Sequence, residues 1–116
     1  MRDLDDRLAN YGACVIKVAT VIPKNVACRH IGSQLVRSGT SVGAHYQEAQ
    51  GAESRADFVH KLQVALKELR ESNYWLQLLA KAEARISDRL APLIDESTQL
   101  RAILSKAVAT AKRNNR

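Results

Sequence analysis

The chain has 116 residues, enough for one domain with a core of its own. Apolar residues make up 46% of it, yet it holds only two prolines and five glycines, which favours a few long helices over a sheet. The sequence has neither an apolar run of membrane-spanning length nor the apolar core of a signal peptide, so we expect a cytoplasmic protein with no membrane partner.

The net charge is +6 and is unevenly distributed along the chain. The positive excess lies in residues 24–50 and 80–116, whereas residues 1–23 and 51–79 are balanced. A basic excess favours an anionic partner such as RNA or DNA, and the alternative is a solvated surface with a basic tail over residues 112–116. The candidate nucleic-acid contacts are Lys24, Arg29, Arg85, Arg89, Arg101, Lys106, Lys112 and Arg113.

The first predicted helix runs from about Asp3 to Val21. Its apolar residues alternate spacings of four and three, which is the pattern of one buried helix face. These residues are Leu4, Leu8, Tyr11, Val15, Val18 and Ile22. Pro23 ends this helix, and Asn25 is a suitable N-cap for the next one.

The second predicted helix runs from about Val26 to Gln50. Its core positions at the same spacings are Cys28, Ile31, Leu35, Ser38, Val42, His45 and Ala49. Because buried polar groups need partners, we expect Ser38 and His45 to be hydrogen-bonded to a facing helix or to water. The two cysteines, Cys14 and Cys28, are expected to be buried free thiols.

Glycines inside the second helix indicate close packing. Gly32, Gly39 and Gly43 lie seven and four residues apart, so they form a strip without side chains on one side of the helix. Each interior glycine costs a helix roughly 0.5–1 kcal/mol relative to alanine. We therefore expect the backbone of a neighbouring helix to approach this strip closely.

The third predicted helix starts at a capping box formed by Ser54 and Asp57. Its core positions are Phe58, Leu62, Ala65, Leu69, Ser72, Leu76 and Leu79. Further apolar residues widen this surface beyond one face, which indicates a central helix or one with a second partner. Trp75 lies at the edge and is our candidate for a subunit interface, and the alternative is a tryptophan packed within the monomer.

The fourth predicted helix runs from Ser87 to about Lys112. Pro92 falls about five residues inside it, which predicts a distorted first turn or a later start. Its core positions are Leu90, Leu93, Ser97, Leu100, Leu104, Ala107 and Ala111. Four helices with short connections predict an all-α fold, an up-down-up-down antiparallel four-helix bundle that forms a single domain over residues 1–116.

Charged residues on the second and third helices predict their register. The turn near residue 52 brings Arg37 opposite Glu68, with Glu71 one turn away, and Glu48 close to Lys61. We expect Arg37–Glu68 and Glu48–Lys61 to be ion pairs between the helices. Such pairs contribute ~0–1 kcal/mol each when they are exposed.

The sequence lacks the residue patterns of a catalytic or metal site. Di-iron bundles take two Glu-x-x-His motifs, whereas His45-x-x-Glu48 has the reverse order and occurs once. The three histidines have no zinc-ligand spacing, and the glycines lie within a helix rather than in a phosphate loop. We therefore expect a protein that is not an enzyme and has no cofactor.

Several short motifs resemble a known family. They are Ser38-Gly39-Thr40-Ser41-Val42-Gly43-Ala44, Glu48-Ala49, Ser54-x-x-Asp57-Phe58, Lys61-Leu62, Leu66-Lys67-Glu68 and Tyr74-Trp75-Leu76-x-Leu78-Leu79. The chain resembles the four-helix-bundle proteins encoded within intervening sequences of bacterial 23S ribosomal RNA genes. It is also similar to the accessory variability protein of diversity-generating retroelements. His45 departs from the family pattern, which usually has asparagine there, and adds a titratable group.

The resemblance implies a homo-oligomer, typically a pentameric ring with a central channel. For the retroelement relatives it implies a basic surface that binds nucleic acid and a reverse transcriptase. We therefore expect phosphate-directed binding of RNA or DNA that is sensitive to salt. The few aromatic residues argue against base stacking on single strands. The alternative is a structural or protein-interaction module that docks through the surface around Trp75.

Overall fold

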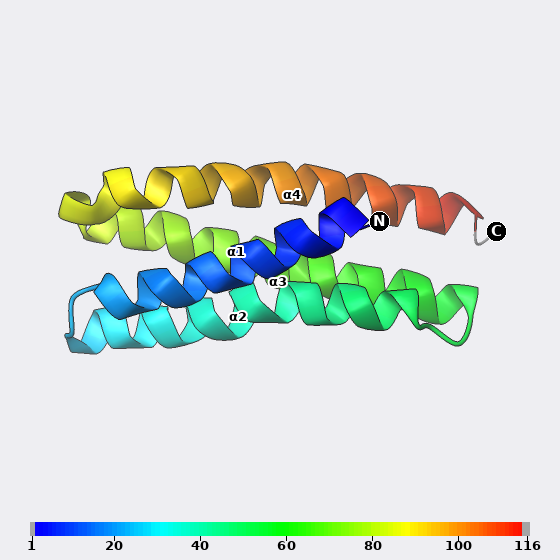
Figure 1. Cartoon of the computed structure of the whole chain (residues 1–116), viewed down its shortest axis with the longest axis horizontal. Coiled ribbons are helices and arrows are strands. Elements are labelled where there is room, and N and C mark those ends of the chain that lie inside the picture. The colour runs from blue at the N-terminus through cyan, green and yellow to red at the C-terminus, as the bar shows by residue number, and fades with distance from the viewer. Residues whose placement is uncertain (1, 115–116) are drawn as a thin grey trace.

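The computed structural model describes residues 2–114, and the expected all-α four-helix bundle is confirmed (Figure 1). The helices are α1 (Arg2–Val21), α2 (Val26–Gln50), α3 (Arg55–Ala82) and α4 (Ser87–Asn114), with a 3-10 turn, η1 (Ala84–Ile86), before α4. The α1–α2 and α3–α4 connections lie at one end of the bundle and the α2–α3 connection lies at the other, with the end of α4 beside it, whereas the shorter α1 begins part-way along the bundle (Figure 1). The molecule measures 48 × 21 × 20 Å.

Side-chain caps fix the starts of α2 and α3. The Asn25 side chain accepts a hydrogen bond of 2.9 Å from the backbone N–H of Cys28, as the sequence predicts. Ser54 accepts one of 3.1 Å from the N–H of Asp57, and the Asp57 carboxylate accepts one of 3.2 Å from the N–H of Glu53. The capping box is thus present, with the carboxylate bonded one residue before the N-cap.

Helix α4 begins at Ser87, as expected, and continues through Pro92. The expectation of a later start is therefore wrong, and the irregular backbone lies before the helix, in η1. Pro92 has no N–H to donate to the carbonyl of Asp88 four residues earlier. Because Pro92 is on the exposed side of α4, water can satisfy that carbonyl.

The four apolar faces meet in one hydrophobic core, and most of the predicted core positions are buried. His45 is an exception, because it is only half-buried and Tyr46 is buried in its place. From Val42 to Ala49, a path through His45 and one through Tyr46 both alternate spacings of three and four. The tyrosine, with the larger apolar surface, occupies the core. Within residues 2–114, His45 makes no hydrogen bond to another residue, so the expected bond to a facing helix is absent.

Two other expectations about buried groups are wrong. Ser38 is fully buried, but its hydroxyl donates to the carbonyl of Gln34 at 2.7 Å in its own helix rather than to a facing helix. Cys28 is buried, whereas Cys14 is exposed. Cys14 lies beside the core face of α1, and both thiols are free as predicted.

The glycine strip of α2 faces α1, which confirms the predicted close approach. A Cβ atom added to Gly39 would lie 2.8 Å from a methyl group of Val15, and one on Gly32 would lie 2.8 Å from Ile22 Cδ1. At Gly43 the nearest atom would be Leu8 Cβ at 3.6 Å. The α1–α2 distance therefore depends most strongly on the missing side chain of Gly39.

A buried polar layer crosses the centre of the bundle. It consists of Tyr11 from α1, Ser72 and Asn73 from α3, and Ser97 from α4, all at most 1% exposed. The Tyr11 hydroxyl is 2.7 Å from Ser72 Oγ, and the Asn73 amide donates to Ser97 Oγ. Every buried side-chain nitrogen and oxygen of the described residues has a hydrogen-bond partner, as the low polarity of a core demands.

Candidate nucleic-acid interface

The structure separates the predicted nucleic-acid contacts into two groups. Lys24, Arg29, Arg85 and Arg89 lie near the end that carries the α1–α2 and α3–α4 connections, and Lys106, Lys112 and Arg113 lie near the opposite end of α4 (Figure 1). Arg101 lies between them and is half-buried, whereas the others are exposed. Arg89 and Lys106 are ~26 Å apart along α4, about three times the Debye length of about 8 Å at physiological salt, so the two groups act largely separately.

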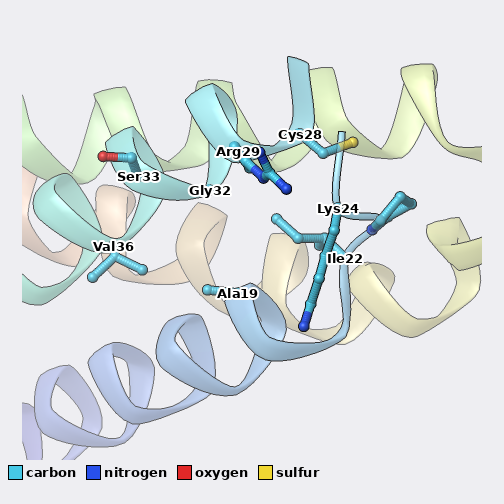
Figure 2. A pocket seen from close by; sticks show the side chains of 9 residues that line it. Ala19, Ile22, Lys24, Cys28, Arg29, Gly32, Ser33 and Val36 are labelled. Atoms are coloured by element: carbon cyan, nitrogen blue, oxygen red, sulfur yellow. The ribbon is translucent and has the colours of Figure 1, made fainter. Parts of the chain in front are cut away.

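Two residues of the first group border a mainly apolar pocket. Lys24 and Arg29 border a pocket of about 500 Å³ between the end of α1 and the start of α2, with Ile22, Cys28 and Val36 in its wall (Figure 2). Arg85 is highly exposed and has Glu83 as a weak partner at 3.9 Å. Arg89 borders a different pocket, together with Lys17, so the four residues do not line one common site.

A second groove, between α3 and α4, contains basic residues that the sequence analysis missed. It has a volume of about 520 Å³ and is bordered by Lys67 and Arg70 of α3 and by Lys112 of α4. Lys67 and Arg70 were overlooked because residues 51–79 contain as many acidic as basic residues. The helical spacing could have revealed Lys67 and Arg70, because it places them on one face of α3 and the acidic residues of α3 on other faces.

The groove belongs to a longer surface that we name the α3–α4 face. On α3 it follows spacings of four and three, and it continues on α4 in the same way. Its residues are Gln63, Lys67, Arg70, Tyr74, Gln77 and Lys81 of α3 and Thr98, Arg101, Ser105, Ala109 and Lys112 of α4. Asn73 Oδ1 accepts hydrogen bonds from Gln77 at 2.6 Å and from Arg101 at 3.3 Å, so the two helices adjoin along this surface.

The α3–α4 face carries five basic residues and no acidic one. From Lys67 to Lys81 the basic residues of α3 extend over ~21 Å of helix. Within the described part of the chain, none of the five is within 4.0 Å of a carboxylate. Lys106 and Arg113 flank the face toward the end of α4 and are exposed, and the exposed Asp88 and Asp95 lie on the same side of the helix nearer its start. The face is therefore a positive surface without internal neutralisation.

Two of the three acidic residues of α3, Glu68 and Glu71, bind Arg37 of α2. The Arg37 guanidinium contacts Glu68 at 3.1 Å and also binds Glu71, so the predicted Arg37–Glu68 pair is confirmed. The hydrogen bond from Arg37, followed by one of 3.0 Å from the Trp75 indole, lowers the pKa of Glu71. These carboxylates are engaged on the opposite flank of α3.

The predicted Glu48–Lys61 pair is wrong. The Lys61 amine contacts Asp57 at 3.2 Å, one turn away on its own helix, and Glu48 is exposed. The pairing within α3 needs no particular approach of α2, which explains the difference. An ion pair that the sequence did not indicate links α1 and α4, where Arg7 contacts Glu96 at 2.7 Å.

Trp75 packs against its own chain. Its indole ring contacts His30 edge-on, with ring centroids 5.8 Å apart, and contacts the Tyr74 ring at 5.2 Å. The side chain is half-buried, and the neighbouring Tyr74 is 57% exposed. The role of Trp75 at a subunit interface stays a prediction.

Among residues 2–114, no three His, Cys, Asp or Glu residues are grouped so as to hold a metal ion. None of the described helices combines the length and hydropathy needed to cross a bilayer.

Comparisons with known proteins identify the family. A family model described as 23S rRNA-intervening sequence protein matches residues 9–106. The chain is similar to the crystal structure of a protein of unknown function from the S23 ribosomal protein family of Bacteroides thetaiotaomicron, with 31% identity and a TM-score of 0.80. That match covers 90% of this chain and 97% of the other. No curated protein matches significantly. The chain therefore belongs to the family of 23S rRNA-intervening sequence proteins.

Proposed function

We propose that this protein is a non-catalytic, oligomeric nucleic-acid-binding protein whose α3–α4 face holds phosphate groups. The observation that supports the proposal is the row of Lys67, Arg70, Lys81, Arg101 and Lys112 without a carboxylate among them. In most solvated surfaces, acidic and basic residues are interspersed. A surface of one sign raises the local concentration of polyanions and speeds their association.

The dimensions of the face suit a nucleic-acid backbone. Phosphates of one strand follow each other at about 3.4 Å along a helix axis, so the ~21 Å between Lys67 and Lys81 corresponds to about six phosphates. The basic residues lie on two adjoining helices and leave a groove of about 520 Å³ between Arg70 and Lys112. A backbone lying along this groove would meet cations on both sides, which favours phosphate contacts over base readout.

The proposal includes assembly into a homo-oligomer, most simply a pentamer. It is supported by the resemblance given above and by exposed apolar side chains on α1 and α2, which are Ile16, Val21 and Val26. A ring of five chains would carry a charge of +30, because each chain carries +6. A reverse transcriptase is the protein partner suggested by the similarity to retroelement accessory proteins, and phosphate binding does not depend on it.

Two triple variants test the proposal. Lys67→Glu with Arg70→Glu and Lys112→Glu reverses the face, and Lys17→Glu with Lys24→Glu and Arg29→Glu reverses exposed residues elsewhere. Both remove the whole net charge of +6, so they differ only in where the charge is lost. The measurement is binding of labelled structured RNA and duplex DNA over a series of salt concentrations. Arg101 is left unchanged because it is bonded to the buried Asn73.

We expect the face variant to bind weakly. The slope of log affinity against log salt concentration should become shallower by about 2–3, because each of the three lost phosphate contacts contributes roughly 0.7–0.9 to that slope. The control variant should keep most of the wild-type slope. Equal losses in both variants would indicate attraction by net charge alone and contradict the proposal. No binding by the wild type at low salt would favour the second candidate, a protein-interaction module that docks beside Trp75, whose neighbour Tyr74 is exposed.

A further inference from the structure

Tyr74 is the exposed aromatic residue of the α3–α4 face. Its side chain is 57% exposed, and it lies one turn after Arg70 and two turns before Lys81. Across the groove, Arg101 reaches the neighbouring Asn73 with a hydrogen bond of 3.3 Å. An aromatic ring in the middle of a row of cations is the combination found where proteins bind single strands. The small number of aromatic residues argues against base stacking, but the position of this ring among the basic residues favours it.

We infer that the α3–α4 face takes unpaired, single-stranded nucleic acid, with one base stacked on the Tyr74 ring. This inference rests on the proposed function, because the phosphates on either side of the base are held by the basic residues of the same face. Binding at this position would tolerate any of the bases, since every base has a π-face. In a duplex the faces of the bases are already stacked, so a duplex gains nothing from Tyr74.

The surroundings of Tyr74 hold the ring in place. Its edge contact with Trp75 has a centroid distance of 5.2 Å, and the Trp75 indole donates to Glu71 at 3.0 Å. Glu71 is in turn bound by Arg37 of α2. The ring is thus supported by a side chain that is itself fixed, which reduces the conformational entropy lost when a base stacks on it.

Polar groups on the same face as the ring suit the edges of unpaired bases. Gln77, one helical turn after Tyr74, donates its amide N–H to Asn73 and keeps its carbonyl oxygen as an acceptor. Arg101 contributes one hydrogen bond to Asn73 and keeps further N–H groups as donors. An acceptor and a donor on this face can pair with the exposed edges of unpaired bases, which a duplex does not offer.

The test compares an end-labelled oligothymidylate with a blunt DNA duplex of the same number of phosphates. Binding is measured by fluorescence anisotropy for the wild type, Tyr74→Leu and Tyr74→Phe, with thermal melting to confirm that each variant is folded. Trp75 is the only tryptophan in the chain, so its emission reports independently on the environment of the Tyr74 ring. The triple reversal of Lys67, Arg70 and Lys112 is measured beside these variants.

We expect the single strand to bind more tightly than the duplex and to change the Trp75 emission. Tyr74→Leu should lose about tenfold or more in affinity for the single strand and leave the duplex unchanged, whereas Tyr74→Phe should bind as the wild type does. If Tyr74→Leu binds both ligands as tightly as the wild type while the triple reversal still weakens them, base stacking is refuted and the proposed function survives. If the triple reversal has no effect either, the proposed function fails.

Discussion

Tyr11 joins two properties that are hard to combine in one residue, a large apolar surface and a hydroxyl group, at a site that is 1% exposed. Its hydroxyl is satisfied by Ser72, whose own hydroxyl donates to the carbonyl of Leu69 at 3.0 Å. Burial raises the pKa of Tyr11 to about 12, and the hydrogen bond with Ser72 partly opposes the shift. The folded chain therefore holds the phenolic proton more tightly than the unfolded chain does.

This shift predicts a loss of stability at high pH. The contribution of Tyr11 is fully present below pH 10, the ordinary value for tyrosine, and is lost as the pH rises toward 12, because the unfolded chain then releases the proton first. We expect the free energy of unfolding in urea to fall over this range by about 2 kcal/mol more for the wild type than for Tyr11→Phe. Tyr74→Phe, which removes the same hydroxyl group from an exposed tyrosine, is measured as the control.

At neutral pH, Tyr11→Phe should cost about 1 kcal/mol through the lost hydrogen bond. Parallel pH profiles for the wild type and Tyr11→Phe would show that the hydroxyl does not titrate differently in the folded and unfolded chains.

Individual side chains were the least predictable part of the molecule. The spacing of apolar residues selected nearly all of the core, but between Val42 and Ala49 it fitted His45 and Tyr46 equally. Ser38 was correctly expected to be buried, yet its partner is its own helix, a choice that depends on side-chain rotamers rather than on sequence spacing. Likewise, Lys61 forms its ion pair with Asp57 rather than with Glu48.

At the scale of helices, the contact between α1 and α2 depends on small residues from both sides. Gly39 faces Val15, and Gly12 faces the backbone of α2 near Thr40. The two glycines differ in the space beside them. A Cβ atom on Gly12 would lie 3.7 Å from its nearest neighbour, at ordinary van der Waals distance, whereas one on Gly39 would lie within 3.2 Å of three Val15 atoms.

We therefore predict opposite effects for two alanine substitutions. Gly12→Ala should stabilise the protein by about 0.5–1 kcal/mol, because alanine favours the helix and meets no clash. Gly39→Ala should destabilise it by about 1–2 kcal/mol, because Val15 is fully buried and cannot move away without disturbing the core. Urea unfolding measures both. If Gly39→Ala were neutral or stabilising, the α1–α2 spacing would not be set by Gly39, and destabilisation by Gly12→Ala would show that α2 is closer to Gly12 than the structure has it.

The helices themselves were largely predictable from the sequence. Alternating spacings of three and four gave their extent, and Asn25 and Ser54 gave the starts of two of them. The Arg37–Glu68 pair followed from the turn between α2 and α3. The effect of Pro92 did not follow, because whether a helix tolerates an internal proline depends on whether water reaches the carbonyl that it leaves unpaired.

For the whole molecule, the candidate interface could not be read from charge along the chain. When charges are summed over segments of the sequence, Lys67 and Glu68 cancel, although the two side chains lie on different sides of α3. Only the pairing of helices shows that Glu68 and Glu71 are occupied by Arg37 and that the basic residues of α3 adjoin those of α4. Three-dimensional packing thus separates charges that are neighbours in sequence.

The proposed assembly makes a prediction at this scale. Sedimentation equilibrium should give the mass of five chains of 12.8 kDa, about 64 kDa, with no dependence on salt over the range used for binding. Independence from salt is expected because the exposed side chains on α1 and α2 that support the proposal are apolar. A mass of 12.8 kDa at every concentration would contradict assembly and leave phosphate binding by a single chain.

The buried polar layer has a consequence for how the chain selects one structure. Long amphipathic helices can slide past each other by one turn, about 5.4 Å, and still bury leucines against leucines. Such a slip of α1 or α4 would separate Tyr11 from Ser72 or Asn73 from Ser97 and leave the Tyr11 hydroxyl or the Asn73 amide N–H unpaired among apolar side chains. Each stranded group costs about 1–3 kcal/mol, a large part of the stability of a small domain. The buried polar layer therefore destabilises bundles in which α1 or α4 is shifted by one turn, although the hydrophobic pattern alone would allow them.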